Sequence, residues 1–269
     1  MKNILQTEFG LKEVEIKKLN GYDNANYLVK TNTAKYIFKT YINSVELHDL
    51  VIAENETLLF LQKSGKNKYP KPIQFTDGSY IKILNIDGEK RICRMLSFLD
   101  GEFLGDTNPT KALFQSFGVF LAEMDINLQK FKNNTIKARQ WEWDIQYLDL
   151  NKKYINDIPN AKDRNTVSYF FLQFEENVKP LLPQLRKQII HNDANEWNVL
   201  TKNGKVSGII DFGDLAHSQL INELAIAITY ACYDKDNPIE WALIILKSYH
   251  SKLPIEEKEI EVLYNLIAA

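Results

Sequence analysis

Residues 191–198 read His-Asn-Asp-Ala-Asn-Glu-Trp-Asn, and residues 210–214 read Ile-Asp-Phe-Gly-Asp. The first segment has the pattern H-x-D-x-x-x-x-N, the second contains D-F-G, and an apolar run lies between them. Each pattern is weak alone, because such short matches arise by chance. Both together, in this order, predict the two loops of a phosphoryl-transfer centre.

Asp193, Asn198 and Asp211 are the residues expected to carry this chemistry. The carboxylate of Asp193 can act as a general base, because it can accept the proton of an attacking hydroxyl group and orient that group. The amide oxygen of Asn198 and the carboxylate of Asp211 are hard oxygen ligands, which Mg²⁺ prefers. The alternative is that both aspartates only cap or form turns. The matching residues at the other motif positions favour the catalytic interpretation.

The remaining motif residues are expected to support the two loops. His191 should hydrogen-bond the backbone near Asp211 and so fix the loop. Phe212 should pack in the core, and Gly213 should adopt a backbone angle that other residues resist.

Length and composition narrow the class of protein. The chain has 269 residues, enough for one large domain or two lobes with a sizeable core. Its formal net charge is −2 with no long run of like charge, so we expect no nucleic-acid partner. The first residues lack the apolar core of an export signal, and no apolar stretch is long enough to span a bilayer. We therefore expect no membrane partner, a cytoplasmic location, and buried thiols at Cys93 and Cys232.

Residues 1–100 are expected to form a β-rich lobe that binds the nucleotide. Aromatic and β-branched residues predict a hairpin and further strands, at 14–19, 27–31, 36–41, 73–75, 80–84 and 91–99. Apolar residues from Leu47 to Leu61 recur at helical spacing and predict one helix in this lobe.

Residues 101–269 are expected to form a larger helical lobe that carries both motif loops. Helical periodicity recurs at 113–128, 143–154, 165–178, 220–233, 238–252 and 255–269. The predicted fold is therefore α+β and bilobal. The last pattern stops without a C-cap glycine, as expected of a chain truncated at its C-terminus or, alternatively, of a terminal helix that frays.

The N-terminal lobe holds the residues expected to bind the nucleotide. Lys39 ends a strand of otherwise apolar residues and resembles the V-A-I-K lysine that contacts phosphates, the alternative being a snorkelling edge-strand lysine. Glu54 shares the apolar face of the predicted helix and is the expected ion-pair partner of Lys39. Gly21 either covers the phosphates or forms an ordinary hairpin turn. The nucleotide base is expected near Ser97 and Leu99.

The motif segments resemble the aminoglycoside phosphotransferase and choline kinase superfamily, which has a protein-kinase-like fold. Residues 190–200, 208–214 and 222–227 look most like its hydroxylysine kinase branch. The resemblance implies a small-molecule kinase that uses Mg²⁺ with ATP or GTP, and it assigns the same roles to Asp193, Asn198, Asp211, Lys39 and Glu54. The branch includes kinases fused to pyridoxal-phosphate enzymes of the class-III aminotransferase type, so such a C-terminal domain is a further expectation.

The acceptor is expected to be small, because a helix is already predicted from Leu220 and leaves no room for the long segment with A-P-E that protein kinases have. Acidic and aromatic residues in or just after the motifs could offset or face an ammonium group: Glu196, Trp197, Asp214 and Glu223. An amino alcohol such as hydroxylysine or ethanolamine is therefore the expected substrate. An aminoglycoside, homoserine or choline phosphotransferase and a non-catalytic pseudokinase remain the alternatives.

Overall fold

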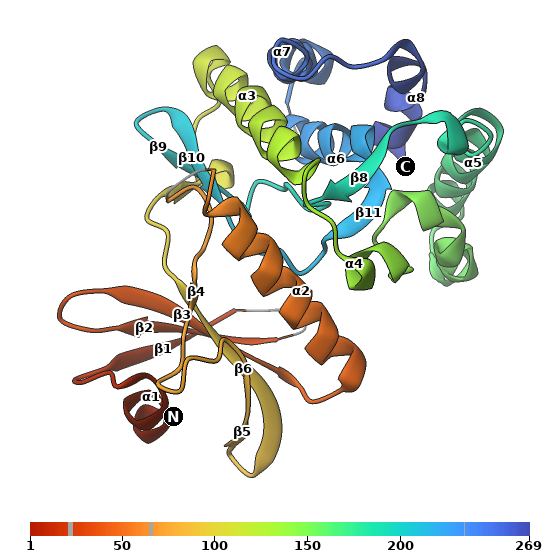
Figure 1. Ribbon diagram of the computed structural model, residues 1–269. Helices are drawn as coiled ribbons and strands as arrows, with labels where there is room; N and C mark the ends of the chain where they lie inside the picture. The colour runs from red at the N-terminus through yellow and green to blue at the C-terminus, as the bar shows by residue number, and fades with distance from the viewer. Residues whose placement is uncertain (21–23, 65–66, 234) are drawn as a thin grey trace. The chain divides into compact units, whose positions relative to one another are not determined.

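The computed structural model describes residues 1–20, 24–64, 67–233 and 235–269. The chain divides into two compact units, residues 1–100 and residues 101–269, called here the N-terminal and C-terminal units. The first is mainly an antiparallel sheet and the second is mainly helical, so the predicted α+β class is confirmed (Figure 1).

The N-terminal unit is built on a six-stranded sheet in which every pairing is antiparallel. The strand order is β1-β2-β3-β6-β4, and β5 also pairs with β6. The strands are β1 (Glu15–Leu19), β2 (Ala25–Lys30), β3 (Lys35–Ile42), β4 (Pro72–Ile73), β5 (Lys82–Ile86) and β6 (Glu89–Ser97). The predicted hairpin is formed by β2 and β3, with the N–H of Thr31 donating to the carbonyl oxygen of Ala34 at 2.8 Å.

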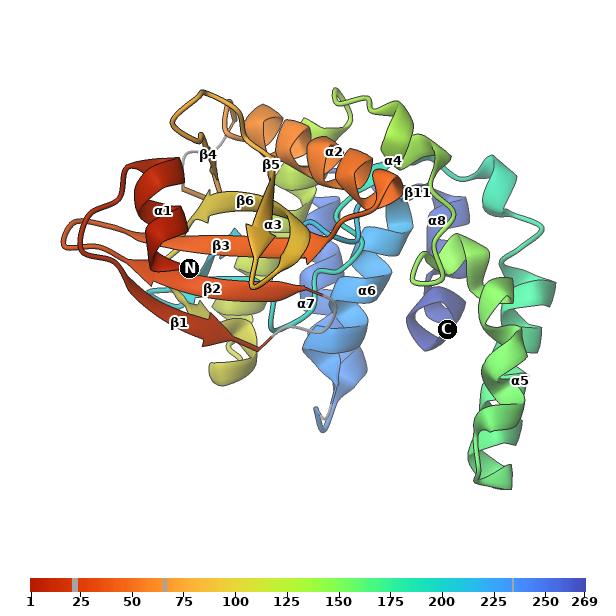
Figure 2. The same ribbon diagram turned by 90° about the horizontal axis from the view of Figure 1, so that it is seen from below.

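One helix packs on each face of this sheet (Figure 2). Helix α1 (Lys2–Phe9) contributes Leu5 to a core with Phe38 of β3, whereas α2 (Val45–Leu61) packs Val51 against Tyr41 of β3. Because successive strand residues point to opposite faces, Lys39 lies on the same face as Tyr41, toward α2. Helix α1 was not predicted, because a helix of 8 residues with one buried side chain shows little periodicity in its sequence.

The C-terminal unit is mainly helical. Its α-helices are α3 (Lys111–Leu128), α4 (Asn134–Ala138), α5 (Ala161–Asn177), α6 (Leu220–Cys232), α7 (Pro238–His250) and α8 (Glu257–Ala268), and its 3₁₀ segments are η1 (Leu104–Asp106), η2 (Ile145–Asp157) and η3 (Leu182–Gln184). Helix α3 packs on α7, and α6 packs on α8. Gly118 permits the first of these contacts, because a Cβ atom there would lie 2.2 Å from the carbonyl oxygen of Ile245.

Two small antiparallel sheets position the motif loops in this unit. One has the order β10-β9-β7, and the other pairs β11 with β8; the strands are β7 (Glu102–Phe103), β8 (Lys187–Ile190), β9 (Val199–Lys202), β10 (Lys205–Ile209) and β11 (Ala216–Gln219). In the β9–β10 hairpin, Val199 lies opposite Ile209. The residues just before β9 and just after β10 therefore emerge at the same end of the hairpin.

The expected α-helix at 143–154 is wrong in type. This segment lies mostly in the 3₁₀ turns of η2, which are interrupted by non-helical angles at Tyr147 (φ −108°, ψ 28°). Leu148 is its one buried residue, so no apolar stripe supports a regular helix. Strand β11 and helix α4 were not predicted, since each is too short to show a period.

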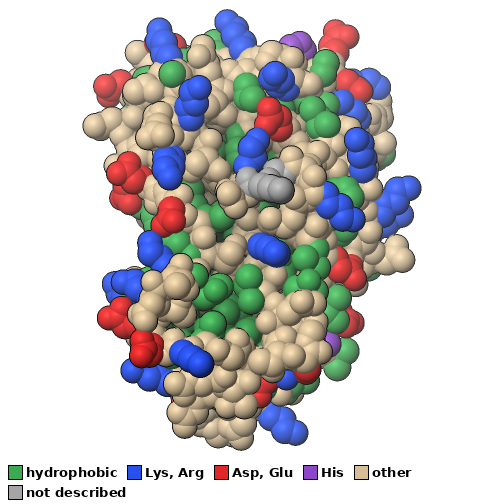
Figure 3. Space-filling view, turned by 60° about the vertical axis from the view of Figure 1, so that its left-hand side comes forward, with side chains coloured by type: hydrophobic (Ala, Val, Ile, Leu, Met, Phe, Trp, Pro, Cys, Tyr) green, Lys and Arg blue, Asp and Glu red, His purple; other side chains and the backbone are tan. Residues whose placement is uncertain are grey.

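The surface carries charges of both signs. On the face shown in Figure 3, lysine and arginine side chains alternate with acidic ones, and no continuous basic tract covers that face. Among the described helices, none is long and apolar enough to cross a membrane.

Candidate active site

Asp193 lies in the loop between β8 and β9, and two asparagines hold its carboxylate. Nδ2 of Asn198 donates to Oδ2 of Asp193 at 2.6 Å, and Nδ2 of Asn195 donates to Oδ1 at 2.8 Å. Oδ1 of Asn195 in turn accepts the backbone N–H groups of Trp197 and Asn198, at 2.8 Å and 3.1 Å. The loop is therefore a closed hydrogen-bonded turn that fixes the direction of the Asp193 side chain.

The environment of Asp193 raises the pKa of its carboxyl group toward neutral pH. The pKa of Asp193 is raised from 3.8 to about 7, mainly by burial and also by the charges of Asp214 and Asp211, while the hydrogen bonds from Asn195 and Asn198 act in the opposite direction. A carboxylate with a pKa close to the working pH is suited to accept a proton from a substrate hydroxyl group.

Asn198 and Asp211 lie together at one end of the β9–β10 hairpin. The N–H of Ile210 donates to the carbonyl oxygen of Asn198 at 2.9 Å, so Asp211 follows directly beside Asn198. Because Nδ2 of Asn198 donates to Asp193, the amide oxygen of Asn198 is the atom that can contact a cation. No cluster of three or more His, Cys, Asp or Glu side chains within the described ranges has the arrangement of a metal site. An amide oxygen, one or two carboxylates and water are nevertheless a donor set that fits Mg²⁺.

His191 joins the two motif loops, as predicted. Its Nε2 donates to the carbonyl oxygen of Ile210 at 3.0 Å, and its Nδ1 accepts the N–H of Asp193 at 3.2 Å. Burial lowers the pKa of His191 to about 4, so the imidazole is neutral at physiological pH and can make both bonds at once. The ring also packs edge-on against Phe212, with ring centroids 4.6 Å apart, and Phe212 is buried as expected.

The backbone angle assigned to Gly213 is corrected by the structure. The positive φ falls on Asp211 (62°), and a second one falls on Asn192 (67°) in the other loop. Aspartate and asparagine are the non-glycine residues that best tolerate this region. Both motif loops thus make their turn at a short polar residue next to the site.

Glu223 was assigned to the acceptor, and that role stays a prediction. Glu223 lies on α6 with its side chain fully buried. Its Oε2 accepts the backbone N–H of His191 at 2.6 Å and that of Asn192 at 3.2 Å. Burial raises the pKa of Glu223 to about 7. Glu223 is therefore a positioning residue that attaches the catalytic loop to α6.

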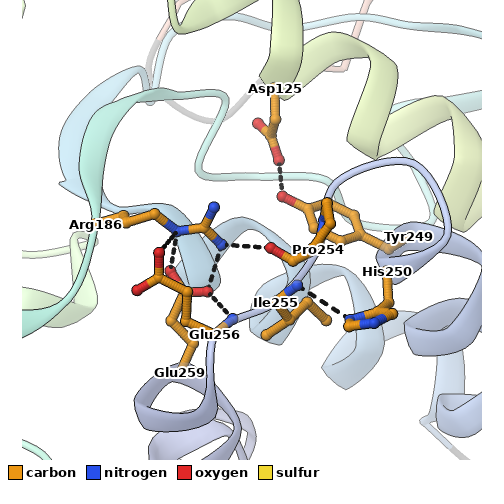
Figure 4. A network of polar contacts seen from close by, with 8 residues as sticks. All are labelled: Asp125, Arg186, Tyr249, His250, Pro254, Ile255, Glu256 and Glu259. Carbon is orange, nitrogen blue, oxygen red and sulfur yellow. Dashed lines mark hydrogen bonds and ion pairs between the residues drawn. The ribbon is translucent and has the colours of Figure 1, made fainter.

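A second buried carboxylate, Asp125 on α3, lies near Glu223. The hydroxyl group of Tyr249 donates to Oδ2 of Asp125 at 2.6 Å (Figure 4). Burial raises the pKa of Asp125 well above its usual value, and the charge of Glu223 adds to this effect. In the same region Arg186 forms an ion pair with Glu259 at 2.5 Å and so attaches α8 to β8.

In the N-terminal unit, Glu54 has a partner that the sequence analysis missed. Glu54 of α2 forms a buried ion pair with Arg94 of β6, and Nε of Arg94 also donates to the hydroxyl group of Tyr41 at 2.7 Å. Arg94 lies directly opposite Lys39 in the pairing of β3 with β6. A single arginine inside the apolar run of β6 was the available signal. The Lys39–Glu54 pair stays a prediction.

The other predicted nucleotide residues are only partly placed. Gly21 lies outside the described residues. Ser97 ends β6, where its Oγ accepts the N–H of Lys71 at 2.9 Å, and the half-buried Leu99 follows outside regular secondary structure. Their roles stay predictions.

The predicted acceptor residues Glu196 and Trp197 lie in the catalytic loop, next to the turn η1. The N–H of Gly105 donates to the carbonyl oxygen of Glu196 at 3.0 Å, and Trp197 packs against Phe103 with ring centroids 6.1 Å apart. Asp214 lies close enough to Asp193 for its charge to raise the pKa of Asp193.

Comparisons with known proteins identify the family of the chain. The model of the phosphotransferase enzyme family, APH, matches residues 15–260. The hydroxylysine kinases of Mus musculus and Xenopus laevis are each 26% identical to this chain, over 99% and 98% of it and 77% of their own lengths. A homoserine kinase of Bartonella henselae is 24% identical, over 91% of this chain and 74% of its own.

Solved structures share the fold. A microcompartment-associated aminopropanol kinase superposes with a TM-score of 0.80 at 17% identity, covering 99% of this chain and 84% of that one. An amicoumacin kinase solved with AMP-PNP and Ca²⁺ gives a TM-score of 0.76 at 16% identity, covering 99% and 81%. The family match spans most of the chain, and the resemblance seen in the motif loops is confirmed. The chain belongs to the APH phosphotransferase family, whose members are kinases that act on hydroxyl groups of small molecules.

Proposed function

We propose that this phosphotransferase transfers the γ-phosphate of ATP or GTP to the hydroxyl group of an amino alcohol, hydroxylysine-like or ethanolamine-like. The observation that carries the proposal is the carboxylate of Asp193, which two asparagine amides orient and whose pKa burial raises to about 7. Such a group can hold the acceptor hydroxyl in line with the phosphate and take up its proton.

Asn198 and Asp211 would hold Mg²⁺ beside this base. The cation supplies positive charge to the nucleotide phosphates when bound. The chain itself supplies the hairpin end that keeps the amide oxygen of Asn198 and the carboxylate of Asp211 adjacent. It also keeps Asp193 and Asp214 close by, where a cation would offset their mutual repulsion.

In the N-terminal unit, Lys39 is the proposed phosphate contact. It is 6% exposed on the face of the sheet that packs on α2, where an ammonium group needs an anionic partner. Arg94 forms a buried ion pair with Glu54 on that face and so helps to hold the helix carboxylate in place. Gly21 remains a proposed contact of the nucleotide phosphates. Ser97 and Leu99 remain proposed contacts of the nucleotide base.

The names of the relatives support the acceptor class. Hydroxylysine, homoserine and aminopropanol each carry a hydroxyl group and an amino group. Homoserine phosphorylation is therefore the second function to test. A pseudokinase is disfavoured, because Lys39, Asp193, Asn198 and Asp211 are all present. The fused pyridoxal-phosphate domain remains a prediction from the motif resemblance.

Phosphoryl transfer from ATP and GTP to 5-hydroxylysine, ethanolamine, homoserine, choline, an aminoglycoside and a sugar without an amino group tests the proposal, with coupled detection of nucleoside diphosphate. We expect Mg²⁺-dependent turnover of an amine acceptor. Asp193→Ala should abolish it, while Asp157→Asn, at an exposed carboxylate on η2, should not. Turnover of a non-amine sugar alone would rule out the amino alcohol. Absence of Mg²⁺-dependent nucleotide binding would rule out the kinase function.

A further inference from the structure

We propose that a basic cavity beside the β8–β11 sheet binds the phosphate group of a small molecule through Lys137, Lys187 and His217. The cavity lies within the C-terminal unit, and none of the proposed catalytic or metal-binding residues lines it. The inference concerns a second site and does not depend on the proposed kinase function.

Helix α4 and the segment before it form one wall of this cavity, and the β8–β11 sheet forms the other. Helix α4 packs against β11. Residues between Gln129 and Lys137 line one side, and residues 187–189 with His217 line the other. His217 lies directly opposite Ile189, so both side chains are on the same face of the sheet. The volume of the cavity is about 230 Å³. At about 30 Å³ for each water molecule, that space suits a phosphate group with a few carbon atoms attached.

The ionisable side chains that line this cavity are all basic: Lys132, Lys137, Lys187 and His217. Among the described residues, no carboxylate lies within ion-pair distance of any of these four. The three lysines of η2 and the end of α5 differ, because each of them pairs with a carboxylate: Lys152, Lys153 and Lys179. The cavity therefore gathers positive charge that nearby side chains do not neutralise by direct pairing.

Two of the lysines lie close to the ring of His217. Burial lowers the pKa of His217, and the charges of Lys187 and Lys137 lower it further. Both ammonium groups are therefore near enough to act on an imidazole that itself lines the cavity. Within the described part of the chain, the imidazole makes no hydrogen bond, whereas the carbonyl oxygen of His217 accepts Nε2 of Gln146 at 2.9 Å. A ring N–H donor thus remains for a ligand.

One carboxylate, that of Asp144, opposes these charges and raises the pKa of His217. Asp144 is 1% exposed and is not part of the cavity lining. Its Oδ1 accepts the hydroxyl group of Ser218 at 2.5 Å and the N–H of Gln146 at 3.2 Å. Lys187 donates to Oε1 of Gln146 at 2.6 Å and not to Asp144. A single buried carboxylate therefore faces two ammonium groups, and the cavity keeps an excess of positive charge.

A phosphate monoester matches this arrangement better than a carboxylate does. It carries about −1.5 to −2 charges at pH 7 and offers three strong acceptor oxygens. Ammonium groups form charge-assisted hydrogen bonds with such oxygens, and two of them balance a dianion. A nucleic acid would need a longer basic tract, whereas this chain has a formal net charge of −2 and a basic cavity of limited size.

Binding at this cavity would stabilise the strands that lead into the catalytic loop. Strand β8 begins at Lys187 and ends at Ile190, directly before His191. A bound phosphate would offset the repulsion between Lys137 of α4 and Lys187 of β8. Because a ligand that binds only the folded state stabilises it, the melting temperature should rise with phosphate concentration.

Calorimetric titration tests the proposal, with inorganic phosphate and glycerol 3-phosphate as probes in a buffer without Mg²⁺. Sodium chloride at equal ionic strength is the control for screening. We expect Lys137→Gln and Lys187→Gln each to raise the Kd by about tenfold, as expected for loss of one charge-assisted hydrogen bond. Lys247→Gln, at an exposed position of α7, is the matched control and should leave the Kd unchanged.

Proton NMR of the His217 ring locates the bound anion. The chain has four histidines, and His217→Asn identifies the signal of this one. The charged groups around the ring are Lys187, Lys137 and Asp144, with Lys132 also lining the cavity. Bound phosphate should raise the pKa of His217, because it opposes the two lysines that lower it. Sodium chloride at equal ionic strength should have a smaller effect.

Tighter binding of glycerol 3-phosphate than of inorganic phosphate would assign the site to a phosphorylated small molecule, and equal binding would assign it to free phosphate. Both results support the phosphate site. The proposal is overturned if neither probe binds, if Lys137→Gln binds both as tightly as the wild type, or if the pKa of His217 does not change. Kinase activity enters none of these measurements, so a failure here leaves the proposed function standing.

Discussion

The carboxylate of Glu223 accepts the backbone N–H of His191 at 2.6 Å, and this bond attaches helix α6 to the loop that carries Asp193. Glu223→Ala would leave that N–H, and the N–H of Asn192, buried without a partner. We expect a loss of about 2–4 kcal/mol in the free energy of unfolding and a fall in kcat of about tenfold or more. Urea denaturation and steady-state kinetics measure the two effects.

Glu223→Gln separates charge from hydrogen bonding in that contact. The amide keeps one acceptor oxygen, so most of the stability and kcat should return. Glu261→Ala, at an exposed position of α8, is the control. If Glu223→Ala lowered kcat no more than this control, the positioning role would be wrong.

The same residue predicts an unusual dependence of stability on pH. Burial raises the pKa of Glu223 from 4.5 to about 7, so the protonated form is favoured by folding. Its contribution is fully present below pH 4.5 and is lost as the pH rises through 7, by at most about 1.4 kcal/mol per pH unit. His191 acts in the opposite sense, because its pKa falls from 6.5 to about 4 and its contribution is lost as the pH falls through that window.

The difference between wild type and Glu223→Gln isolates the first effect, since His191 is common to both. We expect the wild type to lose stability relative to the variant between pH 4.5 and pH 7, measured by urea denaturation at each pH. A constant difference across that range would show that Glu223 is ionised throughout in the folded protein.

The two motif loops were predictable from the sequence, whereas packing partners were not. Asp193, Asn198 and Asp211 could be given candidate roles because phosphoryl transfer needs specific side chains at fixed spacing. Glu223 has the same charge as a substrate-binding residue would have, and only its burial shows that its bonds go to the loop backbone. Sequence periodicity does not indicate which polar residue on an apolar helix faces which neighbour.

Arg94 illustrates the same limit in the N-terminal unit. Glu54 was correctly seen to need a partner, since it shares an apolar helix face. Both Lys39 and Arg94 lie on the sheet face toward α2, as directly opposed residues of β3 and β6. The pairing of β3 with β6 brings both cations to this face, and strand register is a tertiary property.

The buried pair of Arg94 and Glu54 therefore makes a prediction about stability. Arg94→Met would leave the carboxylate of Glu54 buried without its partner and should lower the free energy of unfolding by about 3–5 kcal/mol. Adding Glu54→Gln should restore part of that loss, giving a coupling of at least about 1 kcal/mol in a double-mutant cycle measured by urea denaturation. Additive effects of the two substitutions would show that the pair contributes no net interaction.

Gly118 predicts how closely α3 and α7 must pack. A Cβ atom there would lie 2.2 Å from the carbonyl oxygen of Ile245 and 2.9 Å from the backbone nitrogen of Tyr249, and backbone atoms cannot rotate away. Gly118→Ala should therefore lower the melting temperature strongly despite the better helix propensity of alanine. Lys111→Ala removes an exposed ion pair between Lys111 of α3 and Glu240 of α7, and should change the melting temperature little. Equal melting temperatures would mean that the helices separate without cost.

The acidity of Asp193 predicts the pH profile of the reaction. The base must be ionised to accept a proton, so kcat/KM should rise with pH through the pKa of Asp193, about 7. Burial is the main cause of that value and the charge of Asp214 adds to it, so Asp214→Asn should lower the pKa and shift the acid limb to lower pH. Bound Mg²⁺ should shift the acid limb the same way, because a nearby cation favours the carboxylate form.

Profiles of kcat/KM between pH 5.5 and 8.5, with Asp157→Asn as the exposed control, measure the shift. An acid limb that moves to higher pH in Asp214→Asn would show that Asp214 does not repel the charge on Asp193, and a limb that stays in place would assign it to another group.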